Sequence, residues 1–149
     1  MIQKEALENE LKESLRSGDK VRLRTIRMIL SSVKLAEVDK GEALDDAELT
    51  AIIQKEAKSR REAIEEAEQA GREDLILSNQ EELSILEGYL PEPLSEDEIE
   101  DMAREAAEEV GAEDPGDMGK VMKILMPRVQ GRADGGTVSR IVRKVLSEG

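Results

Sequence analysis

Apolar side chains recur along this chain at the spacing of α-helices, and almost nowhere at the alternating spacing of β-strands. Leu23, Ile26 and Val33, for example, fall on one face of a helix with about 3.6 residues per turn. No run combines period-2 alternation with the Val, Thr and aromatic residues that strands favour, and the 149 residues include a single aromatic, Tyr89. The chain is therefore predicted to be all-α.

Breaks between the amphipathic segments divide the chain into seven expected helices. Pro127 is expected to end or kink the sixth helix, and a glycine-rich loop over residues 131–136 is expected to precede the seventh. The inward-facing positions include Leu15 in the first helix and Leu75 in the fourth. The expected helices cover residues 2–16, 20–38, about 46–70, 72–88, 96–110, about 115–129 and 137–147.

The clearest boundary in the chain is the segment Tyr89-Leu90-Pro91-Glu92-Pro93-Leu94. Two prolines in three residues end a helix and favour extended backbone. Ser95 and Glu98 follow directly in the pattern of a capping box, in which each side chain satisfies the backbone N–H of the other residue. We therefore expect a four-helix N-terminal domain over residues 1–90 and a small three-helix tail domain over residues 91–149.

The side-chain inventory excludes several kinds of active site. The chain has no cysteine and no histidine, which rules out a zinc finger, a disulfide scaffold, a Cys or His nucleophile and a His general base. Phosphate-binding loops, nucleophile elbows and calcium loops of standard spacing are absent as well. No catalytic residue, metal site or cofactor is predicted, and the residues favour a helical binding module over a stand-alone enzyme.

The hydropathy pattern carries no sign of a membrane protein. No apolar run approaches the ~18 residues of a membrane span, and residues 1–5 lack the apolar stretch of a secretory leader. We expect a cytoplasmic protein with no membrane partner.

The net charge of −13 conceals two basic segments on either side of an acidic middle. Residues 12–34 hold seven basic and two acidic residues, residues 117–149 hold seven and three, and residues 35–116 hold seven and 27. The first segment contains five residues at 4-3-4-3 spacing, here called the basic row. These five residues are Lys20, Arg24, Arg27, Ser31 and Lys34.

The 4-3-4-3 spacing places the basic row along one meridian of a helix, and the apolar residues of that helix are expected on other meridians. A row of exposed cations suits a helix that follows a phosphate backbone. The commoner fate of such cations is a solvated face paired with acids of neighbouring helices. Composition leaves both alternatives open.

The second basic segment surrounds the glycine-rich loop, which opens onto the start of the last helix. Free backbone N–H groups and the positive end of the helix dipole favour phosphate at such a place. The alternative is an ordinary helix–helix turn in which Asp134 caps the next helix. The basic residues of this segment are Lys120, Lys123, Arg128, Arg132, Arg140, Arg143 and Lys144.

Several motifs, read in order, identify a family resemblance that covers essentially the whole chain. They are Arg24-Thr-Ile-Arg-Met28, Ala70-Gly-Arg-Glu-Asp-Leu75, Tyr89-Leu-Pro-Glu-Pro-Leu-Ser95, Asp117-Met-Gly-Lys-Val-Met122 and Met126-Pro-Arg-Val-Gln-Gly-Arg-Ala-Asp-Gly135. In this order and spacing the chain resembles the YqeY family. Members of that family are similar to the C-terminal part of the B subunit of the glutamyl-tRNA(Gln)/aspartyl-tRNA(Asn) amidotransferase.

The resemblance implies an all-α fold with a helical domain and a tail domain joined near Tyr-Leu-Pro. In the amidotransferase these regions bind tRNA, while the chemistry resides in other domains and subunits. The resemblance therefore implies a tRNA-binding or amidotransferase-associated module, with the basic tail surface as the best candidate for contact and the basic row as a second candidate. Residues that match the final motif as backbone formers are Gly119, Gly131, Asp134 and Gly135.

Two other functions stay open at this point. The acidic middle of the chain suits a protein–protein adaptor that docks a basic partner, such as a protein of the translation machinery. The family label implies a carbon–nitrogen ligase that uses glutamine as the amido donor. The lack of Cys and His argues against this activity. An acidic chain is also an unusual RNA binder, so any RNA affinity is expected to be local, weak and sensitive to salt. The oligomeric state is not predicted.

Overall fold

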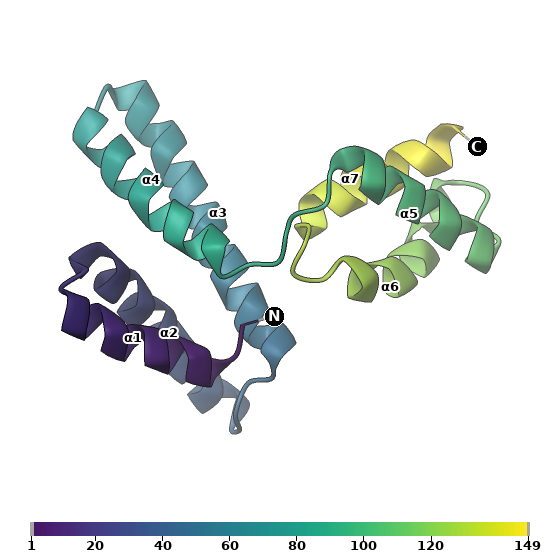
Figure 1. Ribbon diagram of the computed structural model, residues 1–149. Coiled ribbons are helices and arrows are strands. Elements are labelled where there is room, and N and C mark those ends of the chain that lie inside the picture. The colour runs from purple at the N-terminus through teal and green to yellow at the C-terminus, as the bar shows by residue number, and fades with distance from the viewer. Residues whose placement is uncertain (1, 149) are drawn as a thin grey trace. The chain divides into compact units, whose positions relative to one another are not determined.

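Residues 2–148 are described by a computed structural model, and in them seven α-helices and one short 3-10 helix occur without any strand (Figure 1). The all-α prediction is thereby confirmed. The elements are α1 (Lys4–Ser17), α2 (Lys20–Lys40), α3 (Asp46–Ala70), α4 (Glu73–Gly88), α5 (Glu96–Val110), η1 (Pro115–Asp117), α6 (Met118–Val129) and α7 (Gly135–Glu148). No helix of the described range is long and apolar enough to cross a bilayer.

The helices fall into two compact units, of which the first ends at Pro91 and the second begins at Glu92. The first unit holds α1 to α4, and the second holds α5, η1, α6 and α7. The predicted domain bounds, residues 1–90 and 91–149, stay a prediction.

The first unit consists of two helical hairpins, α1 with α2 and α3 with α4 (Figure 1). Helix α2 packs against both helices of the second hairpin, and Ile26 and Val33 of its predicted apolar face are buried while Leu23 is half-buried. Buried aliphatic side chains from all four helices, with Tyr89, make the core by removing apolar surface from water. The core residues are Leu7, Ile26, Ile29, Val33, Leu49, Ile53, Ala57, Leu86 and Tyr89.

Two residues predicted to face inward are exposed in the first unit. Leu15 in the last turn of α1 is 55% exposed, and Leu75 in the first turn of α4 is 42% exposed. Helix α4 packs against the core through Leu83 and Leu86 in its C-terminal half. Its first turn, which holds Leu75, lies outside that core. Periodicity placed Leu75 on the same side of α4 as the buried Leu86, but Leu15 lies off the buried face of α1, where the neighbouring Ser14 is buried instead.

The second unit packs α5, α6 and α7 around a core of its own (Figure 1). Four small or medium side chains of α5 meet three of α6 and five of α7, and together they form a dense aliphatic interior. The buried residues are Ile99, Ala103, Ala106, Ala107, Val121, Leu125, Val129, Val138, Ile141, Val142, Val145 and Leu146.

Three details of the second unit differ from the sequence predictions. Helix α6 continues for two residues past Pro127, although the proline has no N–H to donate to the carbonyl four residues back. Helix α7 begins at Gly135, two residues before the expected start. At the start of α5, Ser95 Oγ accepts the Glu98 N–H at 3.1 Å, but Ser95 Oγ itself donates to the Glu98 carboxylate at 3.2 Å, so the box is incomplete.

Candidate nucleic-acid interface

The basic row lies along the exposed side of α2, opposite the residues that enter the core, and all five members are exposed. Arg24 is the member with an acidic partner, since its Nε and Nη2 both lie 3.0 Å from Glu82 Oε1 on α4. Glu82 also pairs with Arg60 of α3 at 3.0 Å, so Arg24 belongs to a structural ion-pair network. Of the two fates considered for the row, pairing with neighbouring acids therefore applies to Arg24.

The three remaining cations of the row have no ion pair or side-chain hydrogen bond among residues 2–148. They are Lys20, Arg27 and Lys34, here called the free row cations. Their side chains are accordingly available to an external anion without first breaking an internal pair. Whether that anion is a nucleic acid stays a prediction.

Sequence reasoning missed two residues on this side of α2. Leu35 and Val38 are 66% and 71% exposed, and they fall within about 40° of the Arg24 meridian at about 100° per residue. The expectation that the apolar residues of this helix lie on other meridians is therefore wrong for these two. The signal was present in the spacing, because Leu35 follows Ser31 by four residues and Val38 follows Leu35 by three.

Most of the cations predicted in the tail are occupied by acids of the same unit. Arg128 Nη2 lies 2.8 Å from Glu109 on α5, and Arg140 of α7 pairs with Glu96 at the start of α5. Lys144, one turn further along α7, is 3.9 Å from Glu100. These pairs tie α6 and α7 to the acidic helix α5, and they reduce the charge available to RNA phosphates.

Lys120 has a weaker partner than the arginines have. Its Nζ lies 3.7 Å from Asp117 Oδ1, while Asp117 Oδ2 accepts the backbone N–H of Glu113 at 3.1 Å. That backbone hydrogen bond is the main reason that the pKa of Asp117 is lowered. Lys120 itself is exposed and its contact is long, so it keeps much of its positive field toward solvent.

Arg132 forms hydrogen bonds with the backbone of the segment that precedes α5. Its Nε donates to the carbonyl oxygen of Glu92 at 2.9 Å, and its own carbonyl oxygen accepts the N–H of Leu94 at 2.9 Å. The residue thus fastens the proline segment that precedes α5 to the loop that follows α6. A substitution at Arg132 would disturb this connection as well as any phosphate contact.

The glycine-rich loop forms a capped turn. Gly131 is buried and has a φ of 82°, in the left-handed region that a residue with a Cβ disfavours. Asp134 Oδ1 accepts the Thr137 N–H at 3.0 Å, and Asp134 Oδ2 accepts the Thr137 hydroxyl at 2.8 Å. A carboxylate therefore occupies the helix start that the phosphate hypothesis reserved for a ligand, and the capping alternative describes the loop.

The other glycines of the motif play lesser roles. Gly135 is the first residue of α7, and a Cβ built there would meet the methyl group of Met126 at an ordinary 3.8 Å. Gly119 has open space around it in the first turn of α6. At neither position does close packing require a glycine.

Two predicted tail cations remain without a partner in the described chain, Lys123 on α6 and Arg143 on α7. Both are exposed, and both point away from the core, since Val121 and Leu125 on α6 and Val142 on α7 are the buried neighbours. With the loosely held Lys120, they are the predicted tail cations that remain available to an anion.

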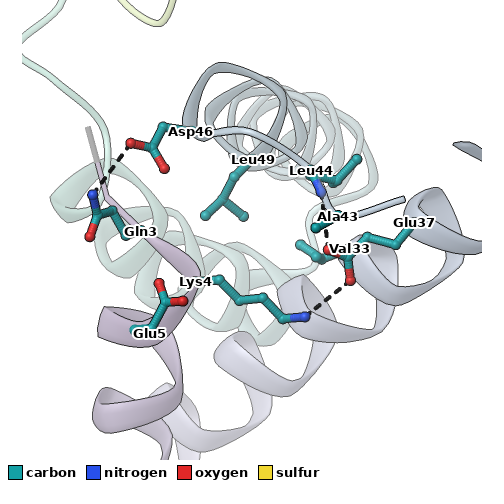
Figure 2. Close-up of a pocket in the computed structure, with 9 residues that line it drawn as sticks. All are labelled: Gln3, Lys4, Glu5, Val33, Glu37, Ala43, Leu44, Asp46 and Leu49. Atoms are coloured by element: carbon teal, nitrogen blue, oxygen red, sulfur yellow. Dashed lines mark hydrogen bonds and ion pairs between the residues drawn. The ribbon is translucent and has the colours of Figure 1, made fainter. Parts of the chain in front are cut away.

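One surface cavity of the first unit has no cation of the basic row in its lining. It measures about 540 Å³ and has Val33 and Leu49 on its apolar side (Figure 2). Lys4 Nζ donates to Glu37 Oε1 at 3.0 Å, and Glu37 Oε2 accepts the Leu44 N–H at 3.1 Å, as the dashed lines in Figure 2 show. The lining residues are Gln3, Lys4, Glu5, Val33, Glu37, Ala43, Leu44, Asp46 and Leu49.

Two charged groups of this cavity, Lys4 and Glu37, are paired with each other. The hydrogen bond between Lys4 and Glu37 raises the pKa of Lys4 and lowers the pKa of Glu37, so both stay charged at neutral pH. A general acid or base needs a pKa near the working pH, which neither group has. Residues 2–148 also bring no three acidic, His or Cys side chains together in a way that could hold a metal ion.

Comparison with known proteins gives relatives in fungi. The chain is 35% identical over 143 residues to "Altered inheritance of mitochondria protein 41, mitochondrial" of Pyrenophora tritici-repentis, which covers 94% of this chain and 78% of that protein. It is 36% identical over 85 residues to the protein of the same name in Kluyveromyces lactis, which covers 56% and 46%. A match to an uncharacterised Schizosaccharomyces pombe protein is 27% identical and covers 60% and 72%. The chain thus spans about half the length of its Kluyveromyces relative.

The names of these relatives correct the predicted location. A cytoplasmic protein was expected, whereas the Pyrenophora and Kluyveromyces relatives are named as mitochondrial proteins. The expectation rested on the lack of an apolar leader or membrane span. Mitochondrial addresses are instead amphipathic, basic and poor in acids, so neither observation bears on them.

The family itself follows from a match along nearly the whole chain. The sequence profile described as "Yqey-like protein" matches residues 4–146, a range that runs from the first residue of α1 to the last turn of α7. The resemblance seen in the motifs is confirmed, and the chain belongs to the YqeY family.

Proposed function

We propose that this protein is a tRNA-binding module that works with an amidotransferase-type partner of the translation machinery and has no catalytic centre of its own. The proposal rests on family membership and on the likeness of the family to the helical and tail regions of the amidotransferase B subunit. In it, the four-helix domain and the three-helix tail domain act as a binding unit, and the tail supplies the RNA contact.

The observation that carries the proposal is that two tail cations have no partner in the described chain, Lys123 on α6 and Arg143 on α7, while Lys120 on α6 is only loosely held. Two or three phosphate contacts form a small electrostatic footprint. The proposal therefore predicts weak affinity that falls with salt, and discrimination by the shape of the RNA rather than by its sequence.

A filter-binding assay with total tRNA at low salt tests the proposal. We expect Lys123→Ala and Arg143→Ala each to weaken binding several-fold, because each removes a charge without disturbing an internal ion pair. Lys58→Ala on α3 is the matched control, since Lys58 is also exposed and unpartnered in the described chain. Because several relatives are named as mitochondrial, mitochondrial tRNA is the first pool to compare. Absence of binding at low salt, or equal losses in all three variants, would contradict the proposal.

A further inference from the structure

The outer side of α2 combines charge with exposed apolar surface in one strip. The basic row occupies the strip from Lys20 to Lys34, and Leu35 and Val38 continue it toward the C-terminal end of the helix. Among the large apolar side chains of the described residues, these two are more exposed than Leu15, Leu75 or Leu77. Two exposed apolar side chains one turn apart, next to a row of cations, can together contact the apolar side chains of a partner, whereas single exposed ones are ordinary.

The free row cations recur every seven residues, at positions 20, 27 and 34. At about 1.5 Å per residue, successive cations are about 10.5 Å apart along the helix. A seven-residue repeat is the spacing at which a second helix, crossing at about 20°, keeps presenting one face to the first. A helix with carboxylates at the same repeat therefore matches the strip along its length.

The apolar end of the strip distinguishes between anionic partners. A phosphate backbone or an anionic membrane is charged throughout, and an extended polyanion would also meet the acidic remainder of a chain whose net charge is −13. A single helix is narrow enough to meet the strip alone. It can also place apolar side chains against Leu35 and Val38, next to the carboxylates that face the free row cations.

We propose that this strip of α2 docks an acidic amphipathic helix of a partner protein, with carboxylates opposite the free row cations and apolar side chains opposite Leu35 and Val38. The inference goes beyond the proposed function, because it uses a different set of residues in the other compact unit. Loss of tRNA binding by the tail would leave it unaffected.

The test uses the full chain and a synthetic helical probe, a fluorescein-labelled peptide of about three heptads with Glu at one heptad position and a pair of leucines near one end. A peptide of the same composition with shuffled positions is the control for periodicity. Fluorescence anisotropy at low salt measures the affinity. We expect Arg27→Glu and Leu35→Ser each to weaken binding about tenfold, since each removes one part of the match. Lys58→Glu and Leu77→Ser, which alter exposed residues elsewhere in the first unit, are expected to bind like wild type.

Charge reversal separates docking from effects on folding. The double variant Arg27→Glu/Lys34→Glu is expected to lose the acidic peptide and to gain a peptide in which Lys replaces Glu. The proposal is overturned by equal binding of the shuffled peptide, or by a tRNA affinity that depends on Arg27 and Lys34 more than on Lys123. It is likewise overturned by a dimer in sedimentation velocity that Leu35→Ser abolishes, since the occupant would then be a second copy of this chain.

Discussion

The hydroxyl of Tyr89 joins side chains that come from three separate parts of the first unit. Arg22 Nη1 donates to Tyr89 Oη at 2.9 Å, and Tyr89 Oη donates to Glu10 Oε2 at 3.0 Å. The Arg22 guanidinium also lies 5.9 Å from the centroid of the ring. The ring is buried, and this burial is the main reason that the pKa of Tyr89 is raised to about 12.

We expect Tyr89→Phe to lower the free energy of unfolding by about 1–2 kcal/mol at neutral pH, because two hydrogen bonds to charged groups are lost. The loss is limited because Arg22 and Glu10 remain 3.3 Å apart and keep their own pair. Urea unfolding measures the difference. A change near zero would mean that solvent or a rearranged Arg22 replaces the hydroxyl.

The same variant is expected to respond differently to alkaline pH. The folded-state pKa of about 12 lies above the ordinary value of 10.0, so the neutral hydroxyl stabilises the fold fully below pH 10 and loses this contribution as the pH rises toward 12. Between about pH 9 and pH 11, wild type is therefore expected to lose about 1 kcal/mol more stability than Tyr89→Phe. Parallel decline of the two proteins in urea titrations would refute the assignment.

At the scale of elements, ion pairs and caps decide how the helices begin and how they meet. Glu82 on α4 contacts Arg24 of α2 and Arg60 of α3, so one carboxylate connects three helices. Asp134 performs the corresponding task at the start of α7, where its carboxylate accepts two hydrogen bonds from Thr137. Neither acid is among the residues proposed to contact RNA, and we expect substitution of either to act mainly on stability.

Glu82→Ala is expected to cost about 2 kcal/mol, because it leaves the half-buried Arg60 without the acid that lies against its Nε. Arg24→Ala removes the exposed partner of the same carboxylate and should cost well under half as much. Thermal unfolding of both variants beside wild type gives the comparison. Equal losses of stability in the two variants would show that the pair between Glu82 and Arg60 adds little to the stability of the first unit.

For α7, Asp134→Ala is expected to cost about 1 kcal/mol through the lost cap, while Asp134→Asn should keep most of the stability. Chemical denaturation followed by circular dichroism measures both variants. If the loop instead bound phosphate, removal of this carboxylate would raise RNA affinity, and that outcome would restore the phosphate hypothesis.

Much of the helical pattern could be predicted because its signals are local. Gly18, Gly41, Gly71 and Gly111 each stand just past a helix with left-handed backbone, as the breaks in periodicity indicated. The fate of the cations could not be predicted in the same way. Glu82 lies 58 residues from Arg24, and Glu96 lies 44 residues from Arg140, so which cations are neutralised depends on packing.

Leu35 and Val38 show a different limit of sequence reasoning. The residues of α2 that enter the core are others, such as Ile26 and Ile29. A reading based on apolar periodicity tends to assign every Leu and Val to the interior. The spacing of Leu35 and Val38 from the basic row could be read from the sequence, but the packed structure was needed to show that both side chains are exposed. The sequence could therefore place the residues of the candidate protein-docking strip on one side of the helix, but it could not show that Leu35 and Val38 stay outside the core.

At the scale of the whole molecule, the net charge of −13 is a poor guide to binding, because it does not show which cations are paired with acids and which are free to bind an anion. Acids of α4 and α5 neutralise Arg24, Arg128 and Arg140, while other cations on α2, α6 and α7 remain without partners in the described chain. The result is an acidic protein with small cationic surfaces. Such a protein should bind a polyanion locally and weakly, and only where salt does not screen the contact.

The salt dependence of tRNA affinity tests the central proposal most directly. With two phosphate contacts made by the tail, the logarithm of the association constant should fall linearly with the logarithm of the salt concentration, with a slope between about −1.4 and −1.8. Lys123→Ala should make that slope shallower by about 0.7 to 0.9, and Lys58→Ala should leave it unchanged. A slope that Lys123→Ala does not alter, or no measurable tRNA binding at the lowest salt, would contradict the account.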